Sequence, residues 1–260
     1  EYGSVLKEGL YEDAERKESL LDLCRFSTNE NEEPISLSQY LEKMPDTQKE
    51  IYYISAETSA QALASPHLEG FKSKNIPVLI MTDAIDQFWL PMIGSFKEKK
   101  FTSITQGKIN LDELDSKNKD KKNKSNDDKD KQDKEYVDLI AQLKVVLGDQ
   151  VKDIRLSSKL TDSPVCLVAD EGDMDIAMEQ LMAQRDSNYK GAPRILEING
   201  DHSLIKNMKS LLSKKESNDL VSDAGTLLFE QARLMEGKMP ADPAQFSKIM
   251  NQFLLKAIPN

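Results

Sequence analysis

The sequence lacks the signatures of several protein classes. Within its 260 residues, no apolar run approaches the roughly 18 residues that a membrane-spanning helix needs. The two cysteines, Cys24 and Cys166, are far apart, so neither a disulfide scaffold nor a CxxC zinc or redox motif is indicated. The two histidines, His67 and His202, are too isolated for a metal site or a catalytic triad, and we expect a surface or capping role for each. A reduced, cytoplasmic protein is therefore the expectation.

The sequence also contains fewer basic than acidic residues. Lysine and arginine number 35 against 45 aspartates and glutamates, and the net charge of −10 argues against a general nucleic-acid binder, which would present a basic face. A hydrophobic content of 38% is typical of a soluble protein, and 260 residues suffice for two domains. The chain opens without an initiator methionine or a signal peptide. We therefore expect a fragment of a longer protein, with neither nucleic acid nor membrane among its partners.

Strand and helix patterns alternate in the first half of the chain. Residues 51–54 are β-branched and aromatic, and residues 78–81 form a continuous apolar run, as in a strand buried on both faces. Two short helices are expected between them, which makes a parallel βαβ unit. Ser36 and Gln39 have the spacing of a capping box that opens another helix. The pattern predicts a small three-layer α/β/α domain over residues 1–112. Other expectations are a lead-in at 5–9 followed by a helix, a helix from Asp83, and a short strand at 101–104.

A charged segment separates the two halves. Residues 115–135 contain no apolar side chain, and eight lysines there are interleaved with seven acidic residues. Such a segment cannot form a core and is nearly neutral overall. We predict a flexible linker at 113–135.

The remaining part, residues 136–260, predicts a mixed α+β domain. The expected elements are helices at 136–147 and 172–185, strands at 151–156, 165–168 and 194–198, a helix from Asp201 to about 214, and a helical hairpin at 218–258.

The hairpin has a broad apolar stripe on each helix. Two amphipathic helices at a chain end cannot bury both stripes against each other alone, so they need the rest of the chain or a second copy. We predict that two copies pair as a four-helix bundle and give a twofold dimer. The predicted dimerisation residues are Leu220, Ala224, Leu227, Leu228, Phe246, Ile249, Met250, Phe253 and Leu254.

Two carboxylates follow the predicted buried strand. Asp83 and Asp86 lie where open α/β sheets place ligands, and two carboxylates can hold Mg²⁺ or act as acid and base. The same spacing also suits the start of a helix, with Asp83 as the N-cap. No glycine-rich phosphate loop accompanies the pair, so capping is favoured. A small metal-dependent enzyme stays as the alternative.

Ten short stretches, in order along the chain, resemble the heat shock protein 90 chaperones, and the bacterial members most. They are LKEG at 6–9, YED at 11–13, LCRFS at 23–27, SLSQY at 36–40, QKEIYYI at 48–54, SPHLE at 65–69, MTDAID at 81–86, VKDIR at 151–155, SKLTDSP at 158–164 and NGDH at 199–202. The sequence departs from the family pattern in three places: the linker is more lysine-rich than usual, Gly200 stands where proline is usual, and the acidic tail of cytosolic eukaryotic members is missing. The missing tail favours a bacterial or organellar origin.

This resemblance implies a V-shaped homodimer of three domains. ATP and Mg²⁺ would bind in an N-terminal domain outside this chain, and client proteins would lie between the two arms. The chain would then be the last part of the middle domain followed by the C-terminal dimerisation domain. Its partners would be itself, partly folded clients and possible co-chaperones. It would hold no cofactor and perform no catalysis.

The resemblance also implies a client-binding surface. Met174, Met178, Leu181 and Met182 recur at helical spacing, and in the family the matching helix contacts clients. An aromatic residue of the helix after Asp83 would join them, with Phe88 and Trp89 as candidates. The alternative is that the methionine stripe is core and that both aromatics pack under their helix. A plain dimerisation module without a client surface is the remaining possibility.

Overall fold

The computed structural model describes residues 3–13, 15–31, 33–114, 122–186, 189, 191–212 and 218–258, of which 112–113 and 122–133 are described by their backbone alone. The chain is mixed α/β with two sheets, and it divides into two compact units. The first contains residues 1–117 and 169–192, and the second contains 118–168 and 193–260. Residues 169–192 therefore belong to the first unit, although the sequence predicts them in the second domain. The predicted domain boundaries themselves stay a prediction.

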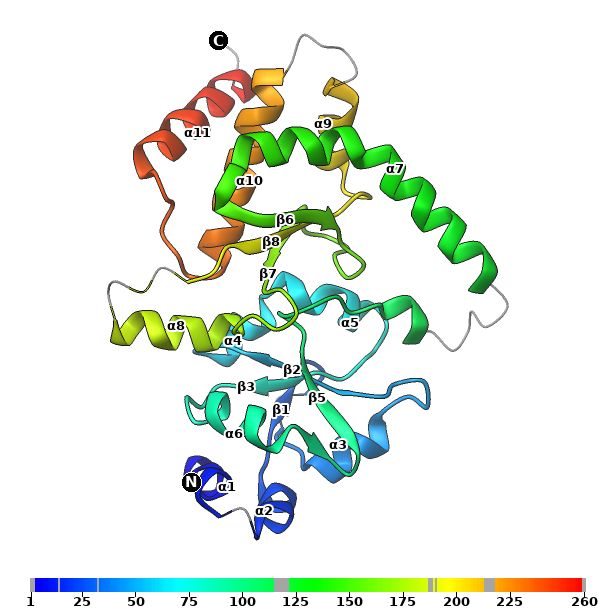
Figure 1. The fold of residues 1–260 in the computed structure, drawn as a ribbon, viewed down its shortest axis with the longest axis vertical. Helices are drawn as coiled ribbons and strands as arrows, with labels where there is room; N and C mark the ends of the chain where they lie inside the picture. Colours follow the sequence, from blue (N-terminus) through cyan, green and yellow to red (C-terminus); the bar gives the residue numbers. More distant parts are fainter. Residues whose placement is uncertain are drawn as a thin grey trace. The chain divides into compact units, whose positions relative to one another are not determined.

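A five-stranded sheet organises the first unit (Figure 1). Its strand order is β1-β3-β2-β5-β4. The elements are α1 (Gly3–Glu12), α2 (Lys17–Leu23), β1 (Ser27–Thr28), α3 (Leu37–Lys43), β2 (Ile51–Ser55), α4 (Ser59–Leu63), η1 (Pro66–Leu68), α5 (Glu69–Ser73), β3 (Leu79–Met81), α6 (Asp86–Ile93), β4 (Ser95–Phe96), β5 (Lys99–Ser103), η2 (Leu111–Leu114) and α8 (Ile176–Arg185). β2 pairs in parallel with β3 and with β5, which confirms the predicted parallel βαβ unit.

Apolar side chains cover both faces of this sheet. On β2, Ile51 points into one cluster, which contains Trp89 of α6, and Tyr52 points into the other, which contains Phe71 of α5. Such alternation is what a strand buried on both faces requires. Helices consequently pack on both sides of the sheet, α1, α2, α3 and α6 on one and α4 and α5 on the other.

The first unit confirms some local predictions and corrects others. The capping box of α3 is present, since Ser36 Oγ accepts the N–H of Gln39 and the side chain of Gln39 accepts the N–H of Ser36. The expected lead-in at 5–9 is wrong, because these residues belong to α1. The buried face of α1 contains Lys7, and this charged residue interrupts the apolar pattern by which an amphipathic helix is recognised. The two-residue strands β1 and β4 were too short to be predicted.

The second unit contains a three-stranded sheet with order β6-β8-β7. Its elements are α7 (Lys122–Leu147), η4 (Gly148–Gln150), β6 (Val151–Leu156), β7 (Val165–Val168), β8 (Arg194–Ile198), α9 (Ser203–Leu212), α10 (Asn218–Met235) and α11 (Pro243–Ala257). All three predicted strands are confirmed. β8 lies in the middle, parallel to β6 and antiparallel to β7. The core joins this sheet to α7, α9 and α10.

The helix α7 begins inside the predicted linker, at Lys122 rather than at Tyr136. Residues 115–121 lie outside the described part of the chain. From residue 122 to 135 the sequence has no proline or glycine. Once the apolar turns from Tyr136 onward are packed, adding a residue to an existing helix costs far less than starting one, so the helix extends backward through charged sequence.

The predicted helical hairpin at 218–258 is confirmed as α10 and α11. Its turn is fixed by Glu230, a buried residue of α10 whose carboxylate oxygens accept the N–H of Ala241 at 3.1 and 3.2 Å. Arg233 donates to the carbonyl oxygen of Met239 at 2.9 Å. The turn between the helices is therefore held by side chains of α10.

Candidate functional site

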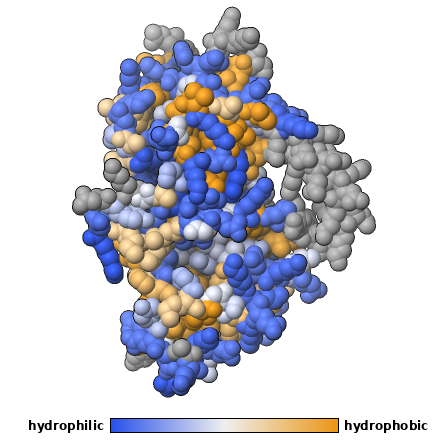
Figure 2. All heavy atoms as spheres, viewed as in Figure 1, coloured by the Kyte–Doolittle hydropathy of each residue, from blue (hydrophilic) through white to orange (hydrophobic). Residues whose placement is uncertain are grey.

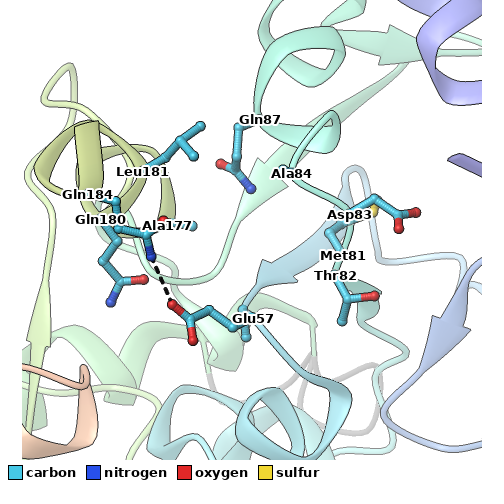
Figure 3. A pocket seen from close by; sticks show the side chains of 11 residues that line it. Glu57, Met81, Thr82, Asp83, Ala84, Gln87, Ala177, Gln180, Leu181 and Gln184 are labelled. Carbon is cyan, nitrogen blue, oxygen red and sulfur yellow. Dashed lines mark hydrogen bonds between the residues drawn. The ribbon is translucent and has the colours of Figure 1, made fainter.

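A cavity of about 290 Å³ lies in the first unit, where the carboxyl ends of β2 and β3 meet α6 and α8 (Figure 3). Because β2 and β3 are parallel, both end at this edge of the sheet, and the N–H of Ala56 donates to the carbonyl oxygen of Met81 at 3.1 Å. α8 forms the opposite wall. The lining side chains include Glu57, Asp83, Gln87, Gln180, Leu181 and Gln184.

Asp175 fixes the start of α8. Its Oδ1 accepts the N–H of Ala177 at 3.0 Å as an N-cap. Its Oδ2 accepts the hydroxyl groups of Ser103 and Thr105, at 2.5 and 2.9 Å. These two hydroxyls lie at the end of β5 and just beyond it. One carboxylate thus caps the helix and ties it to the sheet.

Replacing Asp175 by alanine should lower the free energy of unfolding by about 2–3 kcal/mol. Loss of an N-cap costs about 1 kcal/mol, and the hydroxyls of Ser103 and Thr105 also lose a charged acceptor. Urea unfolding measures the change. Asp242→Ala is the matched control, because the side chain of Asp242 caps α11 by accepting the N–H of Gln245 and, among the described residues, has no tie to a strand. Its loss should cost about 1 kcal/mol. Equal losses in the two variants would show that the ties to β5 contribute nothing.

The predicted client-binding residues of α8 lie between its buried and exposed faces. Met178, Leu181 and Met182 are half-buried, and the side chains of α8 that are buried belong to Ile176 and Glu179. Met174 is 38% exposed and precedes the helix, which begins at Ile176 rather than at Gly172. The stripe therefore keeps accessible surface, which Figure 2 shows as apolar side chains reaching the surface over α8 and α6.

The two aromatic candidates of α6 differ in exposure. Trp89 is fully buried, donates from Nε1 to Oδ1 of Asp86 at 2.8 Å, and meets Phe101 edge-on. Trp89 is a core residue, and its side chain has no exposed surface with which to contact a client. Phe88 is half-buried and meets the ring of Tyr11 edge-on at 6.4 Å between centroids. Phe88 is therefore the aromatic of α6 that can contact a partner.

The carboxylates of Asp83 and Asp86 share one ammonium group. Lys7 Nζ lies 2.8 Å from Oδ2 of Asp83 and 2.9 Å from Oδ1 of Asp86, and it also lies 4.9 Å from the ring centroid of Phe26. Asp86 is fully buried. Burial raises the pKa of its carboxyl group, although Lys7 and Trp89 act to lower it. Lys7 had no visible link to these residues in the sequence, because it lies 76 positions before Asp83.

This arrangement corrects the capping prediction. Asp83 does not cap α6, whose N-cap position is Ile85 and has no side-chain hydrogen bond. Instead, Oδ2 of Asp86 accepts the N–H of Asp83 at 3.2 Å. The enzyme alternative loses support as well, because Lys7 neutralises much of the charge that would attract a metal ion. In the part of the chain that the structure describes, no three His, Cys, Asp or Glu residues gather as a metal-binding group.

The two cysteines and two histidines are buried or cap a helix. Cys24 and Cys166 are both buried thiols, and neither forms a disulfide among the described residues. Burial raises the pKa of Cys24 to about 11, so this thiol stays protonated at neutral pH. Nδ1 of His202 accepts the N–H of Leu204 at 3.1 Å, which confirms a capping role at the start of α9. His67 is buried, so the surface role expected for it is wrong; its one-turn helix packs into the core beside β2 and β3.

The predicted dimerisation residues separate into two groups. Ala224 and Leu228 are buried because α10 packs on the sheet and α7. Ile249 is buried on α11, which packs against α10. Leu220, Leu227, Phe246 and Phe253 are half-buried. Met250 and Leu254 are 38% and 49% exposed. Leu255 of α11 is 76% exposed, and Ile258, directly after the helix, is 71% exposed. The apolar surface left for a partner is therefore mainly on α11.

None of the helices among the described residues combines the length and the apolar character that crossing a membrane requires.

Comparison with known proteins gives one consistent result. The family model described as "Hsp90 protein" matches residues 1–259. "Chaperone protein HtpG" of Roseobacter denitrificans is 40% identical over 259 residues, which is 99% of this chain and 41% of that protein. The proteins of the same name from Streptomyces coelicolor and Wolbachia pipientis wMel are 37% and 38% identical, over 96% and 98% of this chain and 38% and 40% of their own length. The chain thus spans about two fifths of the relatives that it matches.

Proposed function

Because the chain belongs to the Hsp90 protein family, we propose that it is the client-binding and pairing segment of an ATP-dependent, cytoplasmic chaperone. Its first unit would form the end of a middle domain, and its second unit most of a C-terminal domain. ATP and Mg²⁺ would be bound elsewhere in the whole protein. The segment itself binds partly folded clients and a second copy of the chain, and it performs no catalysis.

The observation that supports client binding is the apolar stripe of α8. Met178, Leu181 and Met182 are neither buried in the core nor fully open, and they lie on the helix that walls the cavity. Methionine side chains are flexible and polarisable, so they adapt to varied apolar partners. Phe88 adds a partly exposed ring from α6. Such a surface suits clients that share exposed apolar side chains rather than one sequence.

The exposed apolar side chains of α11 support pairing of two chains. Leu254 and Leu255 in the last turn of α11 and Ile258 at its C-cap are 49–76% exposed. In this proposal two copies of the α10–α11 hairpin meet about a twofold axis as a four-helix bundle. The pair then holds the remaining domains of two protomers at a high effective concentration, so their ATP-driven closure occurs within one molecule.

The double change Met178→Ser and Met182→Ser should weaken client binding about ten-fold with a stability loss of about 1 kcal/mol or less. The reason is that two adaptable apolar contacts are removed from a surface that contributes little to the core. Binding of a soluble, permanently unfolded model protein is measured by fluorescence anisotropy, and stability by urea unfolding. Met239→Ser, at a side chain that is 71% exposed in the second unit, is the control and should change neither. A stability loss above about 3 kcal/mol would identify the stripe as core.

A further inference from the structure

The cavity beside α8 has walls of unlike chemistry. Leu181 and Ala177 give one apolar side, and the carboxylate of Glu57 and the amide of Gln87 lie across from them (Figure 3). We propose that this cavity binds the side chain of an arginine or lysine in an extended client segment, while neighbouring apolar residues of the client lie on the methionine stripe. The inference rests on the proposed function and names the class of client sequence that the site selects.

The charge of the cavity favours a cation. Glu57 is an exposed residue whose Oε1 accepts from Nε2 of Gln184 at 3.1 Å, and a neutral amide leaves the charge of the carboxylate in place. Asp83 is the second carboxylate of the lining, and Asp86 lies beneath it. Lys7 is shared between these two aspartates and offsets part of their charge, so Glu57 supplies most of the negative charge that faces the cavity. The potential at the cavity is therefore negative.

The side-chain directions identify the group that would meet the ligand. In Figure 3, Glu57 and the amide of Gln87 are directed into the cavity, while the carboxylate of Asp83 is turned away from its centre. Asp83 is held in that direction by Lys7 at 2.8 Å. Glu57 is thus the direct partner of a bound cation, and Asp83 acts through its longer-range field.

The remaining lining suits a long basic side chain. The amide oxygens of Gln87 and Gln180 are acceptors, and a guanidinium group offers five N–H donors in a planar fork. The methylene stem of arginine or lysine can lie along Leu181 and Ala177 while the charged end stays with Glu57. A volume of about 290 Å³ holds such a side chain with space for water.

Other occupants match this lining less well. A purely apolar side chain would remove water from Glu57 without supplying a partner, and burial of an unpaired carboxylate is costly. An acidic side chain would be repelled by Glu57 and Asp83. The cavity therefore discriminates between client segments by charge. The neighbouring methionine stripe binds apolar side chains without regard to charge.

A double-mutant cycle tests the inference. The probes are two fluorescent peptides of twelve apolar and small residues that differ at one central position, arginine in one and its neutral isostere citrulline in the other. The 260-residue chain should bind the arginine peptide about five-fold more tightly, as expected for one charge-assisted contact near a protein surface. The Glu57→Gln variant should bind the two peptides with about equal affinity. Glu42→Gln, which removes an exposed carboxylate on α3, should retain the five-fold preference and thereby control for the acidity of the whole chain.

Each other outcome has a distinct meaning. Equal binding of both peptides by the parent chain, or an unchanged preference in Glu57→Gln, overturns the inference. If both peptides then still lose affinity in the Met178→Ser, Met182→Ser variant, the proposed function stands without it. If the parent chain binds neither peptide, the inference and the proposed client surface both fail. Glu57→Gln should unfold at the same urea concentration as the parent chain, because Glu57 is exposed and its side-chain hydrogen bond to Gln184 involves a neutral amide.

Discussion

Lys7→Met should lower the free energy of unfolding by about 3–5 kcal/mol at neutral pH, the typical loss when one partner of a buried ion pair is removed. Lys7 is only 4% exposed, and its ammonium group serves Asp83 and the fully buried Asp86 together. Without it, Asp86 keeps the donors Trp89 Nε1 and the N–H of Asp83 but loses its compensating charge. Urea unfolding at pH 7.5 measures the loss.

The deficit of this variant should depend on pH. The pKa of Asp86 already lies above its ordinary value because the carboxyl group is buried, and Lys7 acts to lower it, so removal of Lys7 raises it further. A carboxyl group with a higher pKa in the folded than in the unfolded state binds a proton preferentially in the folded state. Its contribution to stability therefore increases as pH falls through that range. The deficit should be largest at about pH 7–8 and shrink toward about pH 4–5.

Two further variants identify the source of the loss. Lys7→Met combined with Asp86→Asn should recover more than half of it, because asparagine keeps an acceptor for Trp89 without a charge. Lys17→Met, on the exposed side of α2, should change stability by less than about 0.5 kcal/mol. A Lys7→Met chain as stable as the parent, or a deficit that does not vary with pH, would mean that the charge of Lys7 does not compensate Asp86.

The double change Leu254→Asp and Leu255→Asp should convert a dimer into a monomer. The parent chain of 29.4 kDa is expected to sediment at twice that mass at micromolar concentration. Two aspartates in the apolar surface of α11 would have to be buried without partners on pairing, so the dissociation constant should rise at least about 100-fold. Both leucines are at least 49% exposed, so the fold of the monomer should persist.

Val145→Asp is the control for added surface charge. Val145 lies on α7 of the same unit and is 80% exposed, and its replacement should leave the sedimenting mass unchanged. A parent chain that sediments as a monomer, or a dimer that survives the double change on α11, would refute pairing through this helix. In the second case another surface would have to carry the contact.

Local patterns predicted much of this fold. The strands of the second unit and the capping box at Ser36 depend on neighbours within a few residues, so the sequence alone reveals them. α7 was predicted only from Tyr136 because its first turns are charged, and nothing in their composition reveals helix extension from a packed segment. The two-residue strands β1 and β4 are equally invisible, since they are defined by their partners rather than by their own residues.

In the candidate site, too, features set by neighbouring residues were predicted and features set by distant contacts were not. Met178, Leu181 and Met182 lie on α8 and are half-buried, whereas Met174, predicted as the first residue of the stripe, precedes the helix and is exposed. What spacing could not distinguish was Phe88 from Trp89, because adjacent helical residues differ by about 100° and only the packing decides which is buried. The pairing of Lys7 with Asp83 and Asp86, and the part that Glu57 takes in the cavity, depend on contacts between residues far apart in the chain. Long-range contacts of this kind are set by the tertiary fold.

The client surface can be tested by observing the methionines themselves. The chain carries ten methionines, and ¹³C labelling of their methyl groups gives one NMR signal for each. On titration with a soluble unfolded protein, the signals of Met174, Met178 and Met182 should shift and saturate together. The signals of buried Met208 and of exposed Met239 should stay in place, which separates specific binding from general contact. Binding of the unfolded protein without any change at Met174, Met178 and Met182 would contradict the account.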